Sequence, residues 1–203
     1  MKIKVFPMGS NLTNCYIVFD ENTKEAFCVD VCDKIHQNYF DFIKKEHLNI
    51  RYLFLTHGHY DHTQDIRSFH LNFPDTKIII SKTDYDNIQK NLNVFCEKEK
   101  FVQPDFLCEE GSEYPFCGSV IRTLATPGHT AGSVCYLFGD GIFCGDTIFH
   151  GSVGRTDLPT GSFFDILNSV RRVSALGDYK LYPGHMDVTD MATEKKINEY
   201  FRL

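Results

Sequence analysis

Short apolar runs separated by polar turns recur along the chain and predict alternating strands and helices. Strands are expected at 2–6, 14–19, 25–31, 52–55, 77–81, 119–126, 135–138, 142–144 and 180–182. Ile35, Tyr39, Phe42 and Ile43 follow a helical spacing within 33–47. Further helices are expected from about residue 66 to 73, at 82–90, at 163–173 behind a Ser162–Asp165 capping box, and from 191 onward. This pattern is compatible with an α/β fold.

The stretch 91–113 is polar, contains Pro104 and shows no regular period. Such a stretch either forms a lid or wall near a functional site or is an irregular loop on the surface. We favour the surface loop.

The composition narrows the class of protein. A chain of 203 residues suits a single domain, 1–203, with a buried core. The net charge is −6 without a Lys/Arg cluster, which argues against nucleic-acid and anionic-membrane partners. The first residues carry no apolar run typical of a signal peptide, and no window is typical of a membrane span. We therefore expect a soluble cytoplasmic protein, whose oligomeric state stays open.

Eight cysteines occur without any Cys-x-x-Cys pair. Cys15, Cys28, Cys135 and Cys144 fall in apolar, strand-like runs, where a free thiol behaves as a small hydrophobic group. We expect reduced, structural cysteines.

A dense run of ligand-type residues, Thr56-His57-Gly58-His59-Tyr60-Asp61-His62, follows the strand at 52–55. Alternate side chains of an extended loop face one way, so His57 and His59 can reach one cation together. Asp61 and His62, where the chain turns toward a helix, can face a second cation. Asp30 ends a strand that could neighbour this run. It is either an outer carboxylate that orients a ligand or a simple strand-end residue.

Three more donors stand at predicted strand ends: His129, Asp146 and His185, both histidines preceded by Pro-Gly. Together with the first run they complete a set for two metal ions. One ion would take His57, His59 and His129. The other would take Asp61, His62 and His185, with Asp146 bridging the two. Imidazole and carboxylate suit zinc, which we prefer, and also iron or manganese.

These segments, in this order, resemble the metallo-β-lactamase superfamily. The resemblance implies an αββα sandwich, in which two mixed β-sheets pack face to face and are flanked by helices, and two divalent metal ions. A narrower similarity rests on 145–149, on 151–159 and on Thr189, Glu194 and Asn198, which resemble the short glyoxalase II-like (hydroxyacylglutathione hydrolase-like) branch. In that branch a basic residue at the place of Arg155 contacts glutathione.

Two departures from that branch are visible. The printed sequence stops about where the catalytic core stops, before the C-terminal helical region with which full-length glyoxalase II holds glutathione. A weakly held thiol carrier is therefore expected. Val31-Cys32 stands where many relatives have Pro-Gly, which affects one turn.

The resemblance implies a metal-dependent hydrolase acting on a small-molecule thioester such as S-lactoylglutathione. A metal-bridging hydroxide would attack the carbonyl carbon, Asp61 would ligate and orient it, and the products would be a 2-hydroxy acid and a free thiol. The main alternative is a mononuclear iron persulfide dioxygenase using His57, His129 and Asp146, because that group has a similar Gly-Arg-Thr-Asp segment. A metal-binding module without turnover and a nuclease are weaker alternatives.

Four histidines stand outside the predicted site. His36, His47 and His70 fall on predicted helices and are read as surface or satisfied side chains. His150 is read as a candidate for lining the pocket.

Overall fold

The first of two six-stranded sheets is built from the N-terminal half of the chain. The computed structural model describes residues 1–202. Along this sheet the strands run in chain order: β1 (Lys2–Met8), β2 (Thr13–Phe19), β3 (Glu25–Val29), β4 (Asn49–Phe54), β5 (Lys77–Ser81) and β6 (Phe106–Cys108). The pairs from β1 to β3 are antiparallel and those from β3 to β6 are parallel.

The second sheet follows in the C-terminal half. Its order is β12 (Thr189–Asp190), β11 (Lys180–Pro183), β10 (Gly141–Gly145), β9 (Val134–Phe138), β8 (Ser119–Ala125) and β7 (Glu113–Phe116). Only the β10–β11 pair is parallel among the strand pairs of this sheet within residues 1–202. Both sheets are therefore mixed, as predicted.

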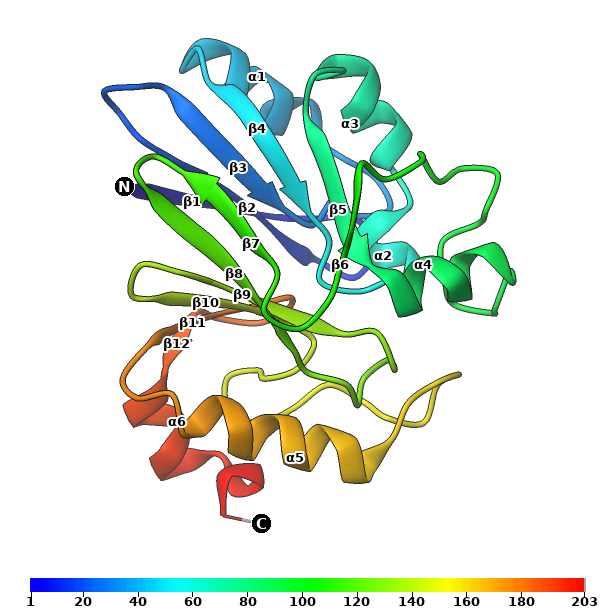
Figure 1. Cartoon of the computed structure of the whole chain (residues 1–203), viewed down its shortest axis with the longest axis vertical. Helices are drawn as coiled ribbons and strands as arrows, with labels where there is room; N and C mark the ends of the chain where they lie inside the picture. The colour runs from blue at the N-terminus through cyan, green and yellow to red at the C-terminus, as the bar shows by residue number, and fades with distance from the viewer. Residues whose placement is uncertain (203) are drawn as a thin grey trace.

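Helices cover the outer faces of both sheets (Figure 1). The first sheet carries α1 (Gln37–Lys45), α3 (Ile66–Asn72) and α4 (Lys82–Gln89), and the single turn α2 (Tyr60–Thr63) follows the carboxyl end of β4. The second sheet carries α5 (Phe163–Ser174), α6 (Met191–Ile197) and the 3₁₀ turn η1 (Glu199–Phe201). The αββα sandwich is confirmed.

Strand alternation explains why the chain forms three apolar layers. In β2 all seven residues are buried. Cys15 and Ile17 face the layer beneath α1, α3 and α4, whereas Tyr16 and Val18 face the layer between the sheets. In β10, Phe143 faces the middle layer, and its neighbours pack toward α5. A strand that is buried on both faces reads as a continuous apolar run, which is why these strands were visible in the sequence.

The structure also corrects the predicted elements. The helix expected at 33–47 spans only Gln37–Lys45. The stretch 91–113 contains the strand β6, and β7 and β12 were not predicted. Pro115 lies in β7, at the edge of its sheet, where a missing backbone N–H is tolerated.

The cysteines agree with the sequence prediction. All eight are free, seven are buried, and Cys117 is partly exposed.

Candidate metal centre

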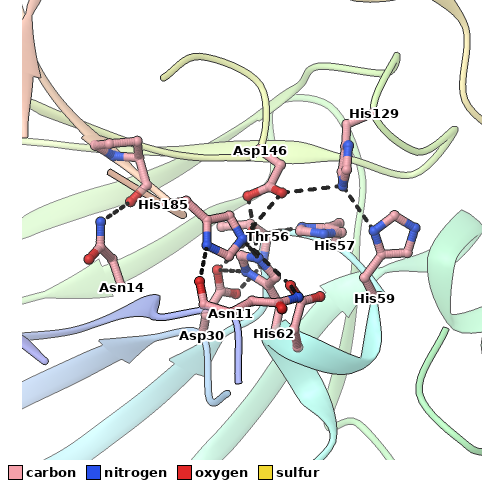
Figure 2. A network of polar contacts seen from close by, with 12 residues as sticks. Asn11, Asn14, Asp30, Thr56, His57, His59, His62, His129, Asp146 and His185 are labelled. Atoms are coloured by element: carbon pink, nitrogen blue, oxygen red, sulfur yellow. Dashed lines mark hydrogen bonds and ion pairs between the residues drawn. The ribbon is translucent and has the colours of Figure 1, made fainter. Parts of the chain in front are cut away.

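The seven predicted donors meet at one edge of the sandwich, where strands of both sheets end (Figure 2). His57 and His59 follow β4, and Asp61 and His62 belong to the short helix α2. The second sheet contributes three donors at the carboxyl ends of β8, β10 and β11, namely His129, Asp146 and His185. Residues up to 128 positions apart in the sequence, 57 and 185, therefore lie within one site.

The two Pro-Gly-His turns require glycine because the backbone passes close to other groups. Gly128 has a φ of 143°, and a Cβ there would collide with the backbone of Ile166 at the start of α5. A Cβ at Gly184 would collide with a carboxylate oxygen of Asp146. Each glycine thus lets the histidine that follows it approach the other donors.

The first donor group consists of His57, His59 and His129, all buried. His59 Nδ1 lies 2.9 Å from His129 Nε2, and the ring centroids of His57 and His129 are 4.7 Å apart. Within residues 1–202, the Nε2 atoms of His57 and His59 are buried without a hydrogen-bond partner. Unpaired buried nitrogens are costly and call for a ligand.

The second donor group consists of Asp61, His62 and His185. The Nε2 atoms of the two histidines are 3.1 Å apart, and Asp61 Oδ2 lies 3.6 Å from His185 Nε2. Asp146 stands between the two groups. Its Oδ1 is 3.3 Å from His62 Nε2 without hydrogen-bond geometry, and its Oδ2 is 3.4 Å from His129 Nε2.

Four of the five imidazoles are oriented by an oxygen at their Nδ1. The partners are Thr56 Oγ1 for His57 at 3.1 Å, Asp30 Oδ2 for His62 at 2.8 Å, the Arg155 carbonyl for His129 at 2.8 Å and the Asn11 carbonyl for His185 at 3.2 Å. An Nδ1–H that donates to oxygen leaves Nε2 as a lone-pair donor facing the site. The outer-carboxylate reading of Asp30 therefore fits the structure.

The charges of the site influence one another strongly. Burial alone would raise the pKa of Asp146, but His62 and His129 outweigh it and lower that pKa to about 2. Asp61 behaves likewise: burial opposes ionisation, yet His62, His185 and Asn11 hold its pKa below the usual range. Burial, together with the neighbouring imidazoles, lowers the pKa of His59 to about 3. Both carboxylates and His59 are thus in the protonation states that bind cations.

The donor set fits divalent cations. Five imidazoles and two ionised carboxylates, without any thiolate, suit zinc, iron or manganese. The buried, unpartnered Nε2 of His57 supplies an independent reason for a bound ion. The site can therefore bind metal.

An open pocket of about 720 Å³ lies over the centre. It is lined by Asn11, His59, Tyr60, Asp61, Val94, His129, Asp146, Phe149, Ser152, Val153, Arg155, Leu158, His185 and Met186. The guanidinium of Arg155 makes two hydrogen bonds of 2.7 Å to the carboxylate of Asp157. These bonds lower the pKa of Asp157 to about 2.

Some sequence expectations do not hold at the pocket. Val94 lines the pocket, and the Phe95 ring packs against the His59 ring at a centroid distance of 5.0 Å. Part of the stretch 91–113 therefore forms a wall of the pocket and is not only a surface loop. His150 does not line the pocket. It contacts Thr189 and the buried Glu194 instead.

Two residues at the site escaped the sequence reading. Asn11 donates to Asp61 Oδ2 at 2.8 Å, while its carbonyl accepts from His185. Asp84, at the start of α4, accepts hydrogen bonds from Gly58 N, between His57 and His59, and from Gly132 N, three residues after His129. Neither residue belongs to a ligand-type cluster in the sequence, so no local signal marked them.

Comparison with known proteins identifies the family to which the chain belongs. Residues 10–185 match the model of the Metallo-beta-lactamase superfamily. The chain belongs to this superfamily. An uncharacterized protein of Aquifex aeolicus is 31% identical to it, over 98% of this chain and 97% of that protein.

Two relatives carry functional names. The probable polyketide biosynthesis zinc-dependent hydrolase BaeB of Bacillus velezensis is 31% identical over 93% of this chain and 81% of its own. The hydroxyacylglutathione hydrolase of Francisella philomiragia is 28% identical over 91% of this chain and 68% of its own.

Solved structures agree on the fold. The BLEG-1 B3 metallo-beta-lactamase superposes with a TM-score of 0.85 at 23% identity, covering 98% of this chain and 99% of its own. ETHE1 from Myxococcus xanthus gives 0.80 at 26% identity, covering 99% of this chain and 88% of its own. Within residues 1–202, no helix combines the length and apolarity needed to cross a membrane.

Proposed function

We propose that this protein is a dinuclear metal-dependent hydrolase that cleaves thioesters of the glutathione type, such as S-lactoylglutathione, to a hydroxy acid and a free thiol. The observation that carries the proposal is the position of Asp146, whose carboxylate lies within 3.5 Å of His62, His129 and His185 and so between the two donor groups. The names of two relatives, a hydroxyacylglutathione hydrolase and a zinc-dependent hydrolase, support the reaction class and zinc as the metal.

Each donor group would hold one divalent ion, with Asp146 shared. When bound, such ions supply Lewis acidity toward the thioester carbonyl and lower the pKa of a nearby water. Asp61 is the catalytic residue of this chain: it remains ionised, lines the pocket and can accept a hydrogen bond from the attacking water. Asn11 fixes the carboxylate of Asp61 through the 2.8 Å hydrogen bond. The thiolate is a good leaving group and needs little help from a general acid.

Arg155 is the side chain of this pocket suited to a substrate carboxylate, because a guanidinium presents a planar fork of donors. The guanidinium already donates two hydrogen bonds to Asp157, so a glutathione carboxylate would replace Asp157 when the thioester binds. The pair is exposed, and exposed ion pairs contribute little to stability. Breaking the Arg155–Asp157 pair therefore costs little of the free energy of substrate binding.

A second candidate is the iron-dependent persulfide dioxygenase. His57, His129 and Asp146 would form the facial triad. His129 Nε2 lies 3.4 Å from Asp146 Oδ2, and the rings of His57 and His129 are 4.7 Å apart, so the three residues lie close enough for a single ion. The similarity to ETHE1 supports the shared scaffold.

One preparation, loaded in turn with zinc, manganese and iron, tests both candidates. Thiol release from S-lactoylglutathione is measured beside oxygen uptake with glutathione persulfide. We expect thiol release, with kcat lost by more than about 100-fold in Asp61→Ala, within the range of a general acid–base contribution. Asp41→Ala, a change at an exposed aspartate that accepts from Gln37 on α1, is the control. Oxygen uptake by the iron form, without thioester cleavage in any form, would replace the hydrolase with the dioxygenase.

A further inference from the structure

The pocket over the metal centre has a largely apolar wall apart from the five donors that line it. Five apolar side chains line it: Val94, Phe149, Val153, Leu158 and Met186. They come from three separate segments of the chain, around residues 94, 149–158 and 186. These side chains place apolar surface in the same pocket as the polar reacting groups, the usual character of a small-molecule site.

Two of these side chains are held by an unusual backbone. Val94 has a φ of 69° and Met186 a φ of 68°, in the left-handed region that L-residues rarely adopt. For a β-branched residue such as Val94 this conformation is a true outlier. Strained residues of this kind concentrate at ligand sites, where the surrounding structure holds them.

Hydrogen bonds to the carbonyl groups hold both residues in place. Tyr60 N donates to the Val94 carbonyl at 3.0 Å, and Asn14 Nδ2 donates to the Met186 carbonyl at 2.8 Å. Both donors belong to segments that build the metal centre: Tyr60 lies between His59 and Asp61, and Asn14 follows Asn11 by three residues. The backbone of Val94 and Met186 is thus fixed relative to the donors. Met186 nevertheless leaves 58% of its surface exposed, so a ligand can reach it.

The polar residues of the wall already have partners. Asn11 donates to Asp61, and the Arg155 fork is occupied by Asp157. Arg155 is the only lysine or arginine among the lining residues in the described part of the chain, residues 1–202. An anionic substrate group must therefore displace Asp157, whereas an uncharged chain meets the apolar wall directly.

We propose that the pocket selects thioesters that carry an uncharged aliphatic chain, and that Val94 and Met186 are the specificity-determining residues. This inference rests on the proposed thioester hydrolysis and names its preferred substrates. The chain has two possible sources: the acyl group, or a thiol arm without carboxylates. Either source would bring the same uncharged apolar groups into contact with the apolar side chains of the wall.

A matrix of substrates separates the two sources. Butyryl, hexanoyl and lactoyl thioesters are compared on glutathione and on N-acetylcysteamine. If the acyl group occupies the wall, hexanoyl exceeds butyryl in kcat/KM by about tenfold on both thiols, the effect of burying two methylene groups. If the thiol arm occupies it, N-acetylcysteamine thioesters exceed their glutathione counterparts in kcat/KM for every acyl group, because an uncharged arm need not displace Asp157. Equal kcat/KM values across the matrix, or S-lactoylglutathione as the best substrate, would overturn the inference.

Glycine substitutions test the two residues directly. Val94→Gly and Met186→Gly remove the side chain while accepting the left-handed backbone. Val94 also packs against the apolar core of the first sheet, so the melting temperature of each variant is recorded beside its kinetics. We expect each to reduce the tenfold preference to about twofold and to leave metal content unchanged. His47→Gly is the matched control, because His47 has a φ of 55° but lies away from the pocket. A preference that survives both pocket variants would assign Val94 and Met186 a purely structural role.

A binding measurement separates this inference from the proposed reaction. The probes are the uncleavable thioethers S-hexyl- and S-ethyl-N-acetylcysteamine, titrated calorimetrically into the metal-loaded protein. We expect the hexyl probe to bind at least about tenfold more tightly, and Val94→Gly to remove most of that difference. If the hexyl probe binds more tightly but no thioester is cleaved, the proposed hydrolysis is contradicted and the selection of aliphatic chains is retained. If thioesters are cleaved but neither assay shows a preference, the selection of aliphatic chains is contradicted and the proposed hydrolysis is retained.

Discussion

At the scale of single residues, the site depends on which nitrogen of each histidine is free. His62 shows the principle: Asp30 accepts from its Nδ1 at 2.8 Å, so in the neutral ring Nε2 carries the lone pair and faces His185 and Asp146. Asp30 is itself held by the backbone N–H and the hydroxyl of Thr56. Two residues that would not touch a metal ion thereby set the orientation of one that would.

Asp30→Asn should weaken metal binding by about 10- to 100-fold, the usual effect of losing an outer carboxylate. An asparagine amide can offer N–H groups to His62 Nδ1, which favours the wrong tautomer. The measurement is a competition titration against a chromophoric chelator. Asp41→Asn, at an exposed carboxylate that accepts from Gln37, should leave the affinity unchanged. An unchanged affinity in Asp30→Asn would show that the orientation of His62 does not depend on this carboxylate.

Arg155 and Asp157 lead to a paired prediction. Arg155→Ala should raise KM for S-lactoylglutathione about two- to fivefold, the scale of an exposed ionic contact, while Asp157→Asn should lower it by a similar factor. Both effects should diminish in high salt, because exposed charges are screened. Steady-state kinetics and melting temperatures are recorded for each variant, with Arg122→Ala, which breaks an exposed pair with Glu113, as control. An unchanged KM with a lower melting temperature would mean that the pair only holds its loop.

At the scale of elements, the sequence revealed the strands that are buried on both faces and the edge strand β1, but missed the other three edge strands, β6, β7 and β12. The strand β5 was predicted with its true bounds, because Ile78, Ile79 and Ile80 are all buried. In β6, Phe106 and Leu107 are exposed, and the strand has only three residues. Its pairing with β5 therefore comes from tertiary structure, which a local apolar pattern cannot reveal.

Asp84 connects elements from the two halves of the sandwich. This fully buried carboxylate on α4 accepts from Gly58 N at 2.8 Å, Gly132 N at 3.1 Å and Thr130 Oγ1 at 2.7 Å. It therefore ties the loop that follows β4 to the loop that carries His129. Burial raises the pKa of Asp84, and the three donors partly oppose that rise. The carboxylate thus accepts hydrogen bonds from buried donors that would otherwise need a buried water molecule.

Asp84→Ala should lower the free energy of unfolding by about 2–4 kcal/mol, because it leaves buried donors without an acceptor. It should also weaken metal binding, since the His57–His59 loop loses its link to His129. Urea unfolding with and without metal measures both effects. Asp86→Ala on the same helix breaks only an exposed pair with Lys82 and should change stability little. A destabilisation equal to that of the Asp86 variant would rule out the connecting role.

At the scale of the whole molecule, neither sheet holds a complete site. His57, His59, Asp61 and His62 come from the half built around the first sheet, and His129, Asp146 and His185 come from the second. The dense first run and the Pro-Gly-His turns made these donors visible in the sequence, because ligand-type residues and turn residues are local signals. Asn11 was invisible, because its contacts to Asp61 and His185 exist only once both sheets have packed.

This division predicts that metal joins the two halves and stabilises the fold. Protein purified gently should hold close to two equivalents of metal by elemental analysis, and chelation should lower its melting temperature. Ions at 100 times their dissociation constant add about 2.7 kcal/mol per site. Binding should weaken as the pH falls, because ligand imidazoles must be neutral and, although burial opposes it, neighbouring carboxylates raise the pKa values of His62 and His185. His185→Ala should lose mainly the ion of the second donor group and retain the other, whereas His70→Ala, on the helix α3, should keep both. A firm single equivalent that does not increase on adding metal would contradict the bridging position of Asp146 and favour a mononuclear centre.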